Sequence, residues 1–227
     1  MSAAALLEFA RGPALWFSLG VLIAGSLWRV FAVWRLGARL DLSEPRSERY
    51  LAGALRGIFA RMLIRKEFRN SRNLGSFNAY VYHVGLAFVV FGYLPHIRFV
   101  ERLTGISWPA LPAWVMYVAA GPTVVGLLIA LLERLSDPVR RLLSGFDDYF
   151  SWLVAFLPLL TGMAAVNLAP APAADGVALY PLPVAIHLLS VELMFLWLPF
   201  GKLGHAFLVF FSRGITGAAL ERKGAAI

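Results

Sequence analysis

The chain contains no cysteine and only four histidines, and charged residues make up just 15% of its 227 residues. Without cysteine, the chain can form no disulfide, attach no c-type haem covalently and hold no thiolate-ligated iron–sulfur cluster. The low charge accompanies a hydrophobic fraction of 59%, whereas soluble domains carry about 25% charged residues. This composition is typical of an integral membrane protein, and it leaves histidine-ligated cofactors open.

Long apolar windows predict the fold. We expect an all-α integral membrane bundle of five transmembrane helices, forming a single membrane domain over residues 1–227 with no room for a soluble catalytic domain. The first window is too long for a signal peptide and is expected to be retained. The last contains Pro199, where we expect a kink before the helix continues out of the membrane. The windows are 13–35, 79–100, 112–133, 149–169 and 182–211.

Basic residues predict the orientation. They concentrate in residues 36–78, in the loop 134–148 and in the C-terminal tail, whereas the loop 168–181 has none. The positive-inside rule then places the N-terminus outside and the C-terminus in the cytoplasm, which requires an odd number of spans. We expect a multi-pass protein of a bacterial or archaeal cytoplasmic membrane. The formal net charge of +8 is explained by these loops and predicts no nucleic-acid partner.

The segment 36–78 is expected to be basic, amphipathic and cytoplasmic. Leu51, Leu55, Ile58 and Met62 recur at helical spacing between its arginines. Two compatible interpretations remain, a helix lying on the lipid surface and a docking surface for a cytoplasmic subunit. On the outer side, Trp108 and Trp114 mark the expected membrane interface between the second and third windows.

The four histidines all fall in two apolar windows, which predicts metal ligation. His187 and His205 are 18 residues apart, which on one straight helix is five turns and a rise of roughly 27 Å. Depth then pairs His83 with His205 near the cytoplasm and His96 with His187 near the outer face. Paired histidines inside a membrane favour two b-type haems with both axial positions filled, an arrangement suited to electron transfer.

The two histidines of the second window do not share a helix face. His96 lies 13 residues after His83, about 220° around an ideal helix, so the two rings face nearly opposite ways. Pro95 can break the helix and re-aim His96. If it does not, His96 is an interfacial histidine and the chain holds one haem.

Four other charged residues lie near the histidines. Arg29, Arg98 and Lys202 are candidates for pairing with haem propionates, although each can instead reach towards lipid headgroups. Glu192 lies inside the last window, where a carboxylate is costly. It is a candidate either for accepting protons from a quinol or for a hydrogen bond within the bundle.

Several motifs resemble a known family. The run from His187 through Leu198-Pro199-Phe200-Gly201-Lys202-Leu203-Gly204-His205 resembles the last span of the gamma (cytochrome b) subunit of respiratory nitrate reductases. Tyr82-His83-Val84-Gly85-Leu86, Ser136-Asp137-Pro138-Val139-Arg140 and Asp147-Asp148-Tyr149 fit as well. Leu157-Pro158-Leu159-Leu160-Thr161-Gly162 is closer to related cytochrome b subunits that partner heterodisulfide-reductase-like iron–sulfur proteins.

This resemblance implies a five-span diheme cytochrome b that exchanges electrons between the quinone pool and a cytoplasmic iron–sulfur subunit, with terminal catalysis in that partner. In the nitrate reductase pattern the second histidine follows ten residues after the first, and here that position is Tyr93, so His96 would take over as ligand. A different class remains as the alternative: a haem-free membrane anchor or transporter whose histidines bind substrate or protons.

Overall fold

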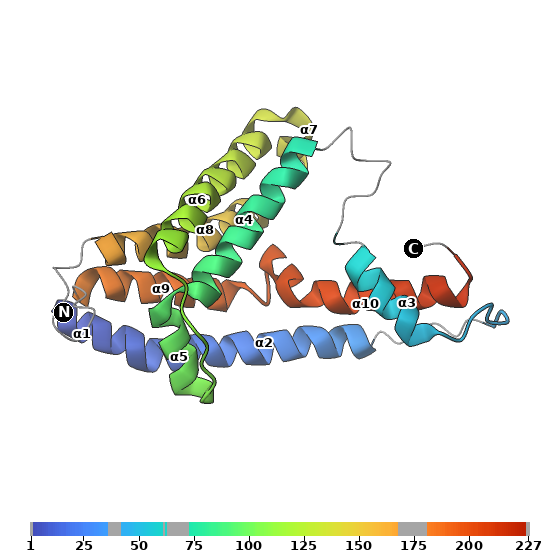
Figure 1. Ribbon diagram of the computed structural model, residues 1–227, viewed down its shortest axis with the longest axis horizontal. Helices are drawn as coiled ribbons and strands as arrows, with labels where there is room; N and C mark the ends of the chain where they lie inside the picture. Colours follow the sequence, from blue (N-terminus) through green and yellow to red (C-terminus); the bar gives the residue numbers. More distant parts are fainter. Residues whose placement is uncertain (1, 36–41, 61, 63–72, 168–180, 226–227) are drawn as a thin grey trace. The chain divides into compact units, whose positions relative to one another are not determined.

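A computed structural model describes residues 2–35, 42–60, 62, 73–167 and 181–225, and every element within them is helical, as expected (Figure 1). The chain divides into two compact units, each described by itself: Met1–Gly12 with Arg72–Val191, and Pro13–Ser71 with Glu192–Ile227. The helices are α1 Ala3–Phe9, the π-helical turn η1 Ala10–Ala14, α2 Leu15–Arg35, α3 Tyr50–Ala60, α4 Asn73–Gly92, α5 Leu94–Thr104, α6 Ala113–Ser136, α7 Pro138–Leu142, α8 Phe146–Asn167, α9 Pro181–Trp197, the 3₁₀ turn η3 Lys202–Gly204 and α10 His205–Arg222.

Long apolar helices account for most of the described chain. Within the described residues, five are long and apolar enough to cross a membrane, as the sequence predicts in number. Four of them contain or overlap the first four windows. The fifth is Lys202–Arg222, and α9 is a shorter apolar helix of 17 residues. The five are Ala3–Arg35, Leu74–Gly92, Ala113–Ser136, Phe146–Val166 and Lys202–Arg222.

The expected last span, 182–211, is wrong as one helix. α9 ends at Trp197, a turn follows, and α10 begins only at His205. Pro199 has no N–H to continue the helix, so the predicted kink is a complete break. Gly25 of α2 packs against this break, because a Cβ there would lie 2.8 Å from Cβ of Pro199. The five-turn relation between the rings of His187 and His205 therefore does not hold.

The second window, 79–100, is also interrupted. α4 ends at Gly92, Tyr93 adopts an extended conformation with φ −83° and ψ 125°, and α5 starts at Leu94 with Pro95 in its first turn. A proline at that position lacks the N–H that a continuous helix would use and clashes with the preceding turn. The break that the sequence offers at Pro95 is thus present, and it separates His83 from His96.

In the first unit, α4, α6 and α8 pack side by side around a small apolar core (Figure 1). Ala120, Leu127 and Leu159 form its buried centre. Gly85 of α4 lies directly against the side chain of Thr123 on α6, where a Cβ would collide. The contacts of Gly85 are therefore those of close helix packing.

The loop between α6 and α8 is organised by two aspartates from the motifs of the sequence. Asp137 caps α7 by accepting hydrogen bonds from the N–H groups of Val139 and Arg140 at 2.8 and 3.1 Å. Asp148 is buried and accepts a hydrogen bond from Arg134 at 2.6 Å. The two motifs therefore lie at helix starts, Asp137 as the cap of α7 and Asp148 in the first turn of α8.

In the second unit, α3 packs along α10 through glycines (Figure 1). A Cβ on Gly57 would lie 2.7 Å from Cα of Gly217, so the two backbones touch. Arg56 and Glu221 form an ion pair at 2.9 Å beside this contact. The expected amphipathic helix is present from Tyr50 to Ala60, and Leu51 and Leu55 on it are exposed. Residues 36–41, 61 and 63–72 of that segment, and most of the loop 168–181, lie outside the described residues.

The candidate histidine site

His187 lies on the first unit's part of α9, where a hydroxyl of α8 binds its ring. Nδ1 of His187 is 3.2 Å from Oγ1 of Thr161, and that hydroxyl donates its own proton to the carbonyl of Leu157 at 2.7 Å. Oγ of Ser190, one turn after His187, lies 2.8 Å from the same Thr161 oxygen. Since the Thr161 hydroxyl is used as a donor to Leu157, it accepts from Nδ1–H, which leaves Nε2 of His187 with its lone pair.

Gly162 makes room for this ring. A Cβ at Gly162 would lie 3.1 Å from Cε1 and 3.3 Å from Nδ1 of His187. A side chain there would push against the imidazole, so the ring lies close to α8 only because residue 162 is glycine. The Thr161-Gly162 pair of the sequence motif thus sets both the hydrogen bond and the position of His187.

His96 lies in the first turn of α5, directly after the break in the second apolar window. Its backbone N–H donates to the carbonyl of Tyr93 at 3.0 Å. Its ring turns back towards α4, where Nδ1 lies 3.0 Å from the carbonyl oxygen of Val89. A carbonyl only accepts, so Nδ1 carries the proton and Nε2 carries the lone pair, as in His187.

The first unit brings His96 and His187 together. Their ring centres are 6.2 Å apart and their planes are inclined by 25°. Both Nδ1 atoms are used in hydrogen bonds to protein oxygens, which is the arrangement by which proteins fix the tautomer and orientation of metal-binding histidines. The expected juxtaposition of this pair is therefore present within a single unit.

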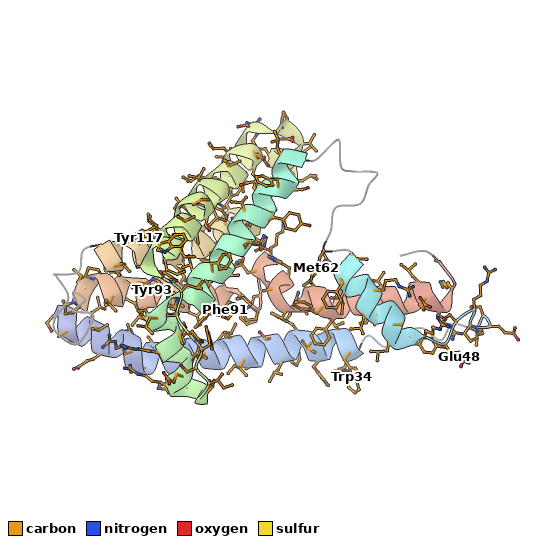
Figure 2. The ribbon with its side chains drawn as sticks, viewed as in Figure 1. Trp34, Glu48, Met62, Phe91, Tyr93 and Tyr117 are labelled. Carbon is orange, nitrogen blue, oxygen red and sulfur yellow. The ribbon has the colours of Figure 1, made fainter. Side chains whose placement is uncertain are left out.

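Tyr93 lies beside this pair at the junction of α4 and α5, and Tyr117 lies on α6 (Figure 2). The ring of Tyr93 meets that of His96 edge-on, with ring centres 5.3 Å apart. Tyr93 occupies the position where the nitrate reductase pattern has a histidine. Here it packs against the histidine that follows the break.

His83 and His205 belong to different units, so their expected pairing stays a prediction. His83 is exposed on α4, and its Nδ1 lies 2.7 Å from the carbonyl of Ala79. His205 begins α10 and is exposed, with Nδ1 2.7 Å from the carbonyl of Lys202. Both rings therefore have the same local arrangement as His96, with the Nδ1 proton given to a backbone oxygen.

The remaining candidates differ in burial. Arg29 on α2, Arg98 on α5 and Lys202 in η3 are all exposed, and their assignment to propionates stays a prediction. Glu192 on α9 is only 4% exposed, and its Oε1 has no hydrogen-bond partner within the described residues. A buried carboxylate oxygen without a partner is unusual, which keeps Glu192 as a candidate for proton exchange.

Metal sites built from three or more acidic, cysteine or histidine side chains are absent from the described part of the chain. An iron held by two histidines needs only two such residues, so this absence does not argue against a site at the His96–His187 pair. The sequence named both histidines of the pair. It did not reveal the Thr161–Ser190 contacts, for which the adjacent Thr161-Gly162 motif was the available signal.

Comparison with known proteins places the chain among relatives. It is 31% identical over 224 residues to a protein of Nitratidesulfovibrio vulgaris strain Hildenborough, an alignment that spans 96% of this chain and 95% of that one. The chain belongs to the same family as that protein, which is named only "Protein", without an activity. No family model and no solved structure matches the chain.

Proposed function

We propose that the protein is a membrane cytochrome b subunit of a quinone-linked respiratory complex. In this proposal His96 and His187 are the axial ligands of one b-type haem, and His83 and His205 are those of a second. The N-terminus lies outside and the C-terminus in the cytoplasm, as the basic loops indicate. The observation that carries the proposal is the pairing of His96 with His187.

The closeness of these two rings supports their assignment to one site. The rings are 6.2 Å apart. Their Nδ1 atoms are bound to Val89 and Thr161, so the Nε2 atoms are the ones available as ligands.

When bound, haem supplies one-electron transfer, and filling both axial positions with histidine leaves none for oxygen chemistry. The protein residues supply position and proton balance. Val89 and Thr161 hold the two rings, and Arg98 near His96 is offered as a counter-charge for a propionate. Glu192 is offered as the acceptor of protons released when a quinol is oxidised, because its buried oxygen lacks a partner.

The partner follows from what this chain lacks. Because the chain has no cysteine to ligate an iron–sulfur cluster, terminal catalysis in this proposal belongs to another subunit. We propose a cytoplasmic iron–sulfur subunit, as the resemblance to nitrate reductase gamma subunits and their heterodisulfide-reductase-linked relatives implies. The basic segment 36–78 is its proposed docking surface or a lipid-facing helix, as the two sequence interpretations allow.

Spectroscopy of the purified protein tests the proposal. We expect a reduced-minus-oxidised b-type spectrum and two acid-extractable haems per chain. The His96→Ala variant should lose one haem, whereas Tyr93→Phe should keep both, because Tyr93 packs on the ligand without binding iron. A colourless, correctly folded wild type contradicts the proposal and favours the haem-free anchor or transporter.

A further inference from the structure

The break between α4 and α5 leaves backbone carbonyls that need partners. Pro95 has no N–H, so the carbonyl of Phe91 loses the partner that it would have in a continuous helix. The N–H of His96 turns to Tyr93 instead of Gly92, so the carbonyl of Gly92 is freed as well. Apolar surroundings make unpaired carbonyls costly.

The segment that follows α5 supplies the missing donors. Gly105 ends α5 in a left-handed conformation with φ 76°, and the chain then returns towards the end of α4. Nε1 of Trp108 donates to the carbonyl of Phe91 at 2.6 Å, and the N–H of Leu111 donates to that of Gly92 at 2.9 Å. The indole of Trp108 therefore replaces the hydrogen bond that Pro95 removes.

His96 depends on the same helix end. Its Nδ1 bonds to the carbonyl of Val89, another of the last four of α4. The direction of the His96 ring is fixed only if the end of α4 keeps its geometry. Leu111 also packs against that end, since a Cβ on Gly92 would lie 2.7 Å from Cδ1 of Leu111. The donors from residues 108 and 111 thus hold the carbonyls next to the acceptor of His96.

We infer that Trp108 is a positioning residue for the ligand His96: its indole N–H closes the Pro95 break and so keeps the His96 ring aimed at His187. This inference rests on the proposed function, because the consequence of mis-aiming His96 is read at an iron held by the pair. It gives Trp108 a role beyond that of a tryptophan at the membrane interface.

Carbon monoxide reports on this role, because it binds ferrous haem only where an axial position is open. Wild-type protein with both positions filled should bind none. Trp108→Phe keeps an aromatic ring but removes the N–H donor, so we expect carbon monoxide to bind at one haem of the two and the low-spin signal of that haem to shift. The signal of the other haem should be unchanged, which shows that the variant is folded.

The matched control is Trp114→Phe, the same substitution in the first turn of α6 at a residue that is 68% exposed. It should bind no carbon monoxide. If Trp108→Phe does not accumulate, the comparison of Trp108→Gln with Trp108→Leu replaces it, because the two side chains are similar in size and only Gln donates. Retention of more six-coordinate haem in the Gln variant supports the inference, and equal retention contradicts it.

The outcomes separate the two proposals. A wild type with two haems and a Trp108→Phe variant with an unchanged spectrum and no carbon monoxide binding overturns the role of Trp108 alone. A wild type without haem overturns the proposed function. A wild type with one haem that survives His96→Ala overturns the His96–His187 site and with it the role of Trp108.

Discussion

At the residue scale, two neighbours on α8 decide where the ring of His187 lies. Thr161 binds Nδ1, and Gly162 leaves the space that the imidazole fills. Threonine and glycine are not candidate ligands by residue type, yet both fix the position of His187, which is one. The strongest sequence signal, a histidine in an apolar window, therefore identifies the candidate ligand but not the residues that orient it.

Removing the Thr161 hydroxyl tests that orientation. Thr161→Val keeps the shape and removes the acceptor of the Nδ1 proton, so we expect haem affinity at the His96–His187 site to fall by about 10- to 100-fold, the usual cost of losing such a partner. Haem per protein after dilution or competition with apomyoglobin measures it. Thr216→Val is the control, because the Thr216 hydroxyl makes the same bond within its own helix, at 2.8 Å to the carbonyl of Ser212. Equal effects of the two variants contradict the role of Thr161.

At the element scale, two prolines determine where the helices that carry His96 and His205 begin. A helix break lies at each of Pro95 and Pro199, and a histidine lies in the first turn of the α-helix that follows: His96 in α5 and His205 in α10. The sequence predicted a disturbance at both prolines. It could not predict that each would be a full break, because that depends on whether the surroundings provide donors and space for the freed carbonyls.

Glycine contacts decide how α3 and α10 pack. Gly57→Ala would place a methyl group 2.6 Å from the carbonyl oxygen of Arg213 and 2.7 Å from Cα of Gly217, both of them backbone atoms that cannot rotate away. We expect destabilisation of about 1–3 kcal/mol, the typical cost of overpacking.

Thermal unfolding of the detergent-solubilised protein, followed by tryptophan fluorescence, measures this cost. Gly20→Ala in α2 is the control, because a Cβ there meets nothing within 4 Å. Alanine is the better helix former by up to about 1 kcal/mol, so this variant should be neutral or more stable. A Gly57→Ala variant as stable as Gly20→Ala would contradict the packing of α3 on α10.

At the scale of the whole molecule, the number of helices that cross the bilayer decides on which side each terminus lies. α9 has 17 apolar residues, and Lys202–Arg222 follows it after a break, so what the sequence treats as one span is two helices. The positive-inside rule predicts that the termini lie on opposite sides of the membrane. The absence of cysteine makes this directly measurable, since any introduced thiol is the only one.

We expect Ser2→Cys to react with a membrane-impermeant maleimide added to intact cells and Lys223→Cys to react only after the membrane is opened. Both residues lie at the ends of the described helices, next to α1 and α10. Labelling of both from the same side would mean an even number of crossings. That result would contradict the proposed orientation and the assignment of His83 and His205 to the cytoplasmic side.

The sequence by itself determined the all-helical class, the number of long apolar helices, the approximate positions of the first four and the four histidines, because hydropathy and residue type act locally and need no neighbours. Only the tertiary structure decided where the last window breaks and that His96 turns to meet His187. The reason is that these features depend on contacts between distant residues, such as Trp108 with Phe91 and Thr161 with His187. Ring direction is a property of the packed neighbours, and no pattern along one helix encodes it.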